Sequence, residues 1–418
     1  MDIVKILKKN TSIIIPAATA LAAILLFIPT ILIQGKISKK IENSLRLGSE
    51  LKSAIKSAVP ATQLEFLKTF EDKHQEDANE IQKLAIQTSQ RELLSYKIFP
   101  EPNETSVQIF NEFKRTYNTA IENLIKDMNA LDAPTDAEVR KEIGAIKNET
   151  PAEQKTTGKG ESSEKITELI CKKRSQQIPV YAKPQVFSGY AFWTNWDYVG
   201  VESAVKDCWY CQLAYWIHQD IVDTVRKINA GSNRVADSPV KRLLGIRFKS
   251  ANAGDTGSNG KEMPVYVTGK EGRLCQPWTG RISNDQIDVI HFSLAAVIRA
   301  DDVLRFMNEL CSEKTHTFSG YKNDQPAQQF KHNQITILQS SIEPVNKEDP
   351  DNKRYLYGQE AVVYLNLICE YLFNKEGYDI IEPNSVKPAL NQAESPTGSQ
   401  RISTPRTKKP KSTSSVED

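Results

Sequence analysis

Residues 287–298, with the sequence IDVIHFSLAAVI, decide the fold class of this chain. The stretch is rich in β-branched and aromatic residues, and both faces of the strand that it would form are largely apolar, which is typical of a central strand in a sheet. Ile290, Phe292 and Leu294 share one face because side chains alternate along a strand. We expect these three residues to lie in the core beneath neighbouring helices.

The spacing of the apolar residues changes after Asp301, a residue type that is favoured at a helix N-cap. Leu304 and Met307 fall on the apolar face of the helix that this spacing predicts, so we expect both in the core. Two more β-rich runs follow at residues 334–345 and 361–373. The polar, proline-containing connector between them is typical of a hairpin loop.

A similar order of elements precedes the central strand. Residues 201–229 predict a long helix with a broad apolar face, and residues 240–248 predict a strand. The unit helix-strand-strand therefore occurs twice. This order indicates an α+β fold, in which a sheet carries its helices on one face.

The most apolar run of the chain is residues 13–33, with no charged residue between Lys9 and Lys36. A helix of this length is roughly 30 Å long, which matches a bilayer core and exceeds the apolar region of a cleaved signal peptide. We therefore predict a transmembrane helix. The residues assigned to this anchor include Ile13, Leu21, Ile24, Leu25, Leu26, Phe27 and Ile33. Lysines lie on both sides, so the positive-inside rule does not decide its orientation.

The rest of the chain divides by composition. Residues 36–148 carry narrow apolar stripes in a polar background, typical of a helical or coiled-coil stalk, with ordinary amphipathic helices packed on the same domain as the alternative. Residues 149–163 are polar and punctuated by glycine and proline, which predicts a linker. The α+β region spans residues 164–382. Residues 383–418 lack apolar periodicity, and we predict a disordered tail.

The sequence offers little chemistry. A formal net charge of +2 gives no overall field that would attract nucleic acid. Cys208 and Cys211 have the C-x-x-C spacing of thiol–disulfide exchange, but they lie inside a predicted helix, so we interpret them as core-facing or mutually paired cysteines. His316 and His332 are interpreted as unlinked structural histidines beside a polar loop. We predict no catalytic residue, metal site or cofactor, and no enzymatic activity.

Four segments carry a resemblance to a known family: residues 211–222 (CQLAYWIHQDIV), 238–248 (SPVKRLLGIRF), 280–311 and 357–373 (YGQEAVVYLNLICEYLF). With the N-terminal anchor and helical stalk, they resemble a divergent bacterial branch of the PilO-like and GspM-like inner-membrane alignment subunits of type IV pilus and type II secretion systems. The resemblance implies a ferredoxin-like periplasmic module and a short cytoplasmic N-terminus, residues 1–12.

The same resemblance implies a structural scaffold that is embedded in the lipid bilayer and forms a homo- or heterodimer with other pilus or secretion subunits. Binding would use the helical stripe of residues 37–94 and the edge strand of the sheet. Two alternative functions stay open at the level of sequence. One is a membrane-tethered thiol oxidoreductase that uses Cys208 and Cys211, and the other is a membrane-anchored ligand sensor.

Overall fold

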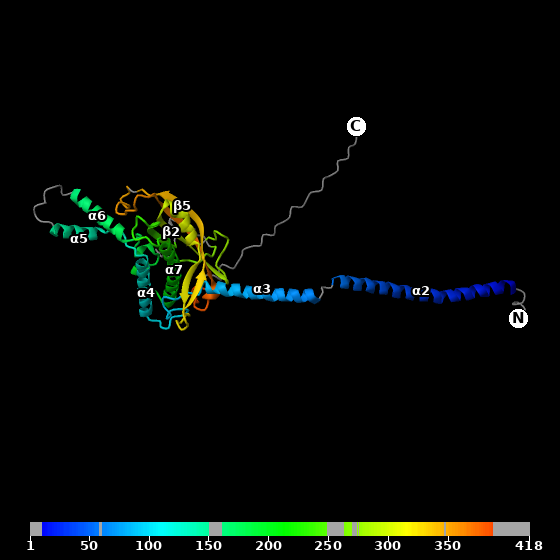
Figure 1. Ribbon diagram of the computed structural model, residues 1–418. Coiled ribbons are helices and arrows are strands. Elements are labelled where there is room, and N and C mark those ends of the chain that lie inside the picture. The colour runs from blue at the N-terminus through cyan, green and yellow to red at the C-terminus, as the bar shows by residue number, and fades with distance from the viewer. Residues whose placement is uncertain are drawn as a thin grey trace, which may run out of the picture. The chain divides into compact units, whose positions relative to one another are not determined.

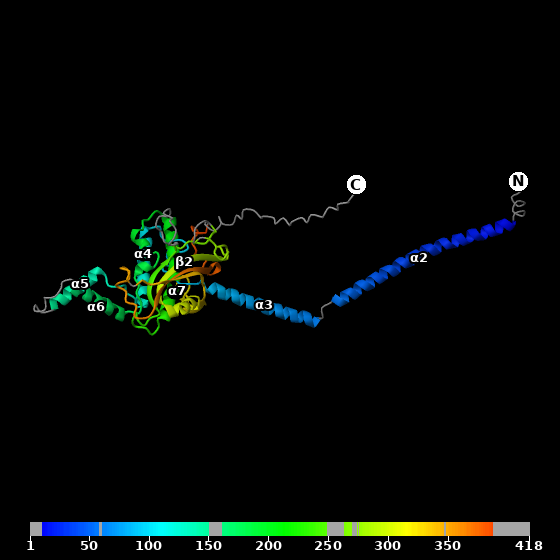
Figure 2. The ribbon, with the colours of Figure 1, turned by 90° about the horizontal axis from the view of Figure 1, so that it is seen from above.

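The computed structural model (Figures 1 and 2) describes residues 11–57, 61–149, 161–248, 263–269, 274, 276–346 and 348–387. By its internal contacts the chain separates into two units, Met1–Glu80 and Ile81–Asp418. The described part of the first unit is helical, and the second unit contains the sheet.

In the first unit, α2 spans Thr11–Ser57, and α3, which spans Ala61–Gln87, begins there and ends in the second unit. Large apolar side chains of both helices are exposed to solvent. They include Ile37, Ile41, Leu45, Leu51, Ile55, Leu64 and Leu67. These residues form the stripes that the sequence predicts for a stalk, and within the described part of the unit they are not covered.

The predicted anchor falls within α2. No helix in the part of the chain that the structure describes is long and apolar enough to cross a membrane. Of the predicted anchor residues, Leu21 and Leu25 are exposed. The side chains of Ile13, Ile24, Leu26, Phe27 and Ile33 lie outside the described residues.

The second unit has an α+β fold built on a four-stranded antiparallel sheet with the strand order β1-β2-β6-β5. The strands are β1 (Val240–Arg247), β2 (Ile287–Arg299), β5 (Ile335–Pro344) and β6 (Val362–Asn374). β2 pairs with β6 along its whole length, from Ile287 opposite Asn374 to Arg299 opposite Val362. The strand that decides the fold class is therefore an interior strand, which explains why most of its residues are buried.

One face of the sheet is covered by α7 (Val201–Ile228) and α8 (Val303–Leu310), which follows the short η4 (Ala300–Asp302). Ile290, Phe292 and Leu294 of β2 are buried there in one core with Trp216 of α7 and Phe306 of α8. α4 (Val107–Asp127) packs against α7 and lies beside it in both views (Figures 1 and 2).

The apolar face of α8 differs from the predicted one. Leu304 is 73% exposed, and Met307 is only partly buried at the edge of the core. The buried face consists of Val303, Phe306 and Leu310, because positions three and four apart lie above one another on a helix. Placing Leu304 in the core overlooked Phe306, which is the largest apolar side chain of this helix and faces inward.

The predicted stalk, residues 36–148, is too long. Phe113 and Tyr117 of α4 are buried in the same core as Trp193 and Trp209, and the Tyr117 hydroxyl donates a hydrogen bond to the Ser188 carbonyl at 2.9 Å. A dense aromatic stripe is too bulky to remain exposed on a stalk, since it gains from burial. The sheet-containing body of the protein therefore includes α4, although this helix precedes the predicted linker in the sequence.

α5 (Asp136–Glu149) and α6 (Glu161–Gln177) form a helical pair, seen side by side in both views (Figures 1 and 2). Thr135 and Glu138 close a capping box at the start of α5: the Thr135 N–H donates to Glu138 Oε2 at 2.8 Å, and the Glu138 N–H donates to Thr135 Oγ1 at 3.2 Å. Most of the predicted linker, residues 149–163, lies outside the described residues.

The C-terminal boundary also differs from the prediction. The packed chain continues past β6 through η5 (Lys375–Gly377) to residue 387, and Val386 is completely buried. The predicted tail therefore does not begin at residue 383. Residues 388–418 lie outside the described part of the chain.

Candidate interaction surface

The two edges of the sheet differ. The segment from Tyr181 to Phe187, which includes η2 (Pro184–Val186), runs parallel to the outer edge of β1. The Tyr181 N–H donates to the Lys241 carbonyl and the Leu243 N–H donates to the Tyr181 carbonyl, both at 2.9 Å. β1 is therefore covered. Within the described residues, no strand pairs with the outer edge of β5.

β5 has few of the features that usually protect an exposed edge. Its sequence, ITILQSSIEP, contains no lysine and a single charge at Glu343, and proline occurs only at its last position. The side chain of Ile342 is 55% exposed. Native edge strands are commonly protected by charges, bulges or proline, because unpaired N–H and C=O groups accept a strand from another chain. In β5 these features amount to the charge of Glu343, the terminal proline and a bulge between Ile337 and Gln339.

The face of the sheet opposite α7 has a depression of about 510 Å³ across all four strands. Its floor is made largely of small or polar side chains from the middle of each strand. They include Gly245, Ser293, Ala295, Asn366 and Ser341. Toward the end where β2 begins, this face is covered by the loop that contains Thr279 and Arg281, which hydrogen-bond the buried Glu370 at 2.7 and 2.9 Å.

The end of α3 is fastened to the body by a buried group that we call the Asp220 cluster: Arg91, Asp220, His316, His332 and Tyr371. Arg91 forms a bidentate ion pair with Asp220, in which Nη2 lies 2.8 Å from Oδ1 and Nη1 lies 3.1 Å from Oδ2. Arg91 Nη1 also donates to the Tyr371 hydroxyl at 2.9 Å, and that hydroxyl donates to Asp220 at 2.6 Å. The cluster thus joins the chain after α3 to α7 and β6.

Burial alone would raise the pKa of Asp220, but Arg91 and His332 hold it below its ordinary value. The ion pair is nearly inaccessible, with 5% of the Arg91 side chain and 2% of the Asp220 side chain exposed. Removing one partner from such a pair would leave an uncompensated buried charge. The Asp220 cluster is therefore a structural joint with little tolerance for loss of either charge.

The predicted unlinked histidines are linked in the structure. His316 lies on β3 (Lys314–Phe318) and His332 on β4 (Gln328–His332), which form a separate two-stranded sheet. Their Nδ1 atoms are 2.9 Å apart, and His332 Nε2 lies 3.0 Å from Asp220 Oδ2. The sequence contains no periodic pattern that would have predicted this, because β3 and β4 are largely polar.

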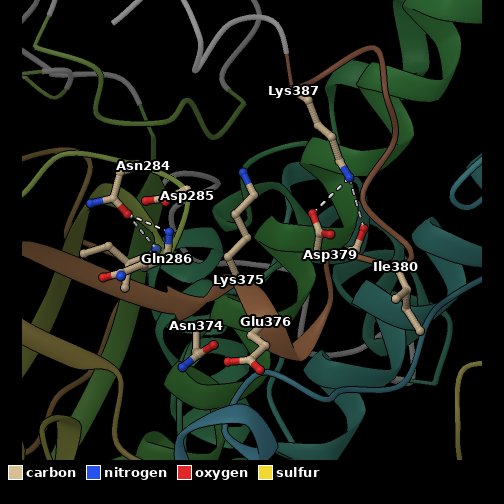
Figure 3. Close-up of a pocket in the computed structure, with 10 residues that line it drawn as sticks. Asn284, Asp285, Gln286, Asn374, Lys375, Glu376, Asp379, Ile380 and Lys387 are labelled. Carbon is tan, nitrogen blue, oxygen red and sulfur yellow. Dashed lines mark hydrogen bonds and ion pairs between the residues drawn. The ribbon is translucent and has the colours of Figure 1, made fainter. Parts of the chain in front are cut away.

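A pocket of about 800 Å³ lies at the end of the sheet where β2 begins and β6 ends. Figure 3 shows the side chains that line it. Its charged side chains have both signs and are partly paired with one another. Lys387 Nζ lies 2.9 Å from Asp379 Oδ1, and Asn284 Oδ1 accepts the Gln286 N–H at 2.8 Å. The lining thus mixes Lys375 and Lys387 with Asp285, Glu376 and Asp379, and it offers no cluster of one sign that would select an anion or a cation.

Two buried carboxyl groups, Asp288 and Glu382, lie next to this pocket. Lys375 Nζ is 3.2 Å from Glu382 Oε2, and the Tyr378 hydroxyl donates a hydrogen bond to Asp288. Burial and the neighbouring Glu382 raise the pKa of Asp288 to about 7. A proton at this site therefore stabilises the packing of the segment that follows η5.

Cys208 and Cys211 are both completely buried within α7, and neither forms a disulfide. Burial raises the pKa of the Cys208 thiol well above its ordinary value, and the nearby Asp207 adds to this rise. A redox-active cysteine needs the opposite, an accessible thiol with a lowered pKa. Cys211 Sγ contacts Met263 Sδ at 3.8 Å. The pair therefore has the properties of core residues.

Among the residues that the structure describes, no group of three or more His, Cys, Asp or Glu side chains could hold a metal ion. His291 contacts the Leu274 carbonyl at 2.9 Å and Glu370 at 3.3 Å, as a structural histidine would. His218 is buried between the rings of Phe187 and Phe248. Burial lowers the pKa of His218 to about 3, and Arg247 contributes to this shift.

A scan against protein-family models found no match, and a search of curated proteins found none either. Among solved structures, the chain is similar to two from Akkermansia muciniphila. One is a crystal structure, with 10% sequence identity and a TM-score of 0.24, covering 64% of this chain and 97% of that chain. The other was determined without its transmembrane region, with 10% identity and a TM-score of 0.24, covering 68% of this chain and 91% of that chain.

Proposed function

We propose that this protein is a structural scaffold subunit of a pilus or secretion assembly, of the PilO-like or GspM-like kind, and that it acts through protein–protein contacts without catalysis. The observation that carries the proposal is the open, nearly uncharged edge of β5. An edge of this kind accepts a strand from a second chain by main-chain hydrogen bonding. The partner is a second copy of this chain or a similar subunit.

The strand order supports the proposal. Two consecutive helix-strand-strand units, α7-β1-β2 and α8-β5-β6, form a sheet in the order β1-β2-β6-β5 with all neighbours antiparallel. This is the order of a ferredoxin-like sheet whose chain starts at a helix. The hairpin of β3 and β4 is an addition between α8 and β5. Such a module offers packing and pairing surfaces and needs no polar reaction centre.

The proposal places residues 13–33 in the bacterial inner membrane and the sheet-containing body in the periplasm. Its support is the length of the apolar run in the sequence. The exposed apolar residues of α2 and α3, such as Ile41, Ile55 and Leu67, would then pack against the matching helices of the partner. The two contacts use different groups, since one uses helical side chains and the other uses main-chain groups of the sheet.

The β5 interface is tested with Ile342→Lys in the full chain, solubilised in mild detergent and studied by analytical ultracentrifugation. Lysine adds a charge to an edge strand whose only charged residue is Glu343, and charges on an edge oppose pairing with another strand, so we expect dimer dissociation to become at least about tenfold easier. Leu304→Lys on α8 is the matched control, since it makes the same change at an exposed apolar side chain away from the edge. It should leave the association unchanged.

A native chain that stays monomeric at high concentration, and that is purified from its own host without any pilus or secretion subunit, would count heavily against a scaffold. Equal weakening by Ile342→Lys and Leu304→Lys would place the contact outside the β5 edge.

A further inference from the structure

The two histidines of the Asp220 cluster form a continuous chain of short contacts. His316 Nε2 lies 2.9 Å from the Gln90 carbonyl oxygen, and the Nδ1 atoms of His316 and His332 are 2.9 Å apart. His332 Nε2 lies 3.0 Å from Asp220 Oδ2. Each ring nitrogen therefore has one partner, and the outer two partners are oxygen atoms that only accept hydrogen bonds.

Counting protons along this chain fixes the charge of the pair. The contacts to the Gln90 carbonyl and to the Asp220 carboxylate each require an N–H, and the Nδ1–Nδ1 contact requires one hydrogen between the two rings. Three hydrogens are needed. Two neutral imidazoles carry only two, so one contact would bring two lone pairs together at hydrogen-bonding distance. The geometry thus requires a single extra proton.

The surroundings indicate which ring holds the charge. Burial, together with Arg91 and His332, lowers the pKa of His316 to about 4, so this ring is neutral near pH 7. With the single hydrogen of neutral His316 on Nε2, the count leaves two hydrogens for His332, whose Nε2 lies 3.0 Å from Asp220 Oδ2. His332 then donates from both nitrogens, and neutral His316 accepts at Nδ1 and donates at Nε2 to Gln90.

Other charged and titratable groups from the elements packed around the pair are Asp220 itself and residues that interact with Asp220. They are Arg91 after α3, Asp220 and Asp223 on α7, Lys314 on β3 and Tyr371 on β6. Arg91 and Asp220 neutralise each other in their ion pair. Lys314 is engaged by carbonyl groups at the end of α8, including the Leu310 carbonyl at 2.8 Å.

We propose that His316 and His332 are a one-proton switch that fastens residues 89–94, the segment directly after α3, to the body of the protein. The same segment makes two further contacts with α7: Trp216 Nε1 donates to the Glu92 carbonyl at 2.9 Å, and the Leu94 N–H donates to Gln212 Oε1 at 2.7 Å. Loss of the proton at high pH leaves one contact without its hydrogen. A second proton at low pH places two hydrogens between the Nδ1 atoms.

The protonation state is measured directly by nitrogen NMR of the full chain with labelled histidine side chains, in which spectra of His316→Gln and His74→Gln assign the signals. The expected result near pH 7 is three protonated nitrogens among the four of the pair, with both nitrogens of His332 carrying hydrogen. Two neutral rings near pH 7 would overturn the proposal.

The switch itself is measured by hydrogen exchange of the Leu94 amide from about pH 4 to about pH 9, corrected for the intrinsic pH dependence of exchange. We expect protection to be highest near neutral pH and to fall about tenfold on each side, the effect of losing one charge-assisted hydrogen bond. In His316→Gln, the two amide hydrogens can serve the Gln90 carbonyl and His332 without a charge, so the fall at high pH should disappear. The exposed His74→Gln variant should behave like the native chain. Protection that does not change with pH would overturn the switch.

Discussion

Among single residues, Asp288 stands out because a negative charge on its buried side chain destabilises the folded state. Its side chain is completely buried, and burial with the neighbouring Glu382 raises its pKa from 3.8 to about 7. The unfolded chain has the ordinary pKa of an aspartate, about 3.9. The folded state therefore binds the proton more tightly. The resulting stability is fully present below the unfolded pKa and is lost as the pH rises through about 7.

Asp288→Asn should remove this loss, because asparagine has the same shape, stays neutral and can still accept a hydrogen bond from Tyr378. We expect the melting temperature of the native chain to fall by roughly several degrees between about pH 6 and about pH 8, and that of the variant to fall much less. Thermal unfolding monitored by circular dichroism measures both. Asp285→Asn, a change at an exposed neighbour, should retain the native slope, and an unchanged slope in Asp288→Asn would contradict the assignment.

At the scale of elements, α8 allows a sharp comparison. Phe306 is completely buried and Leu304 is 73% exposed on the same helix. Phe306→Ala should lower the free energy of unfolding by about 3 to 5 kcal/mol, since it removes a buried ring and leaves a cavity. Leu304→Ala should change it by less than about 0.5 kcal/mol. Denaturant unfolding of both variants tests which face of α8 is packed, and equal losses would refute the assignment.

The strands of the large sheet were predictable because their signals are local. Residues 287–298 are rich in β-branched and aromatic residues, and the helix of residues 201–229 has a broad apolar face, so each element is recognisable in a short window. β3 and β4, with the sequences KTHTF and QQFKH, were missed since they are short and polar. The hydrogen bond of His332 to Asp220 spans 112 positions, so no local pattern encodes it.

The features of the candidate interaction surface also differ in whether a local sequence pattern encodes them. An edge strand and apolar helical stripes follow from the sequence pattern, although the sequence does not say which strand lies at the open edge. The joint after α3 could not be predicted, because the Arg91–Asp220 pair joins positions 129 apart. Two isolated charges in a sequence with 25% charged residues look like ordinary surface residues until the fold brings them together.

At the scale of the whole molecule, the proposed anchor makes a simple prediction. The full chain should stay with membranes during extraction with alkaline carbonate, because a helix of roughly twenty apolar residues inserts into a bilayer almost irreversibly. Deletion of residues 13–33 should release the chain. Fractionation of cells followed by immunoblotting measures this. An equally long deletion within residues 388–418 should leave the chain in the membrane fraction. Release of the undeleted chain by carbonate would contradict the anchor.

The segment from Tyr181 to Phe187, which covers β1, has a consequence for the size of any assembly. Indefinite growth by strand pairing requires two free edges per molecule, one to receive a neighbour and one to offer to the next. In the described body, the large sheet has one. When two such sheets meet through β5, both free edges are consumed and the pairing is closed. The protein can therefore leave one strand edge open for its partner without forming fibres by successive pairing of this sheet.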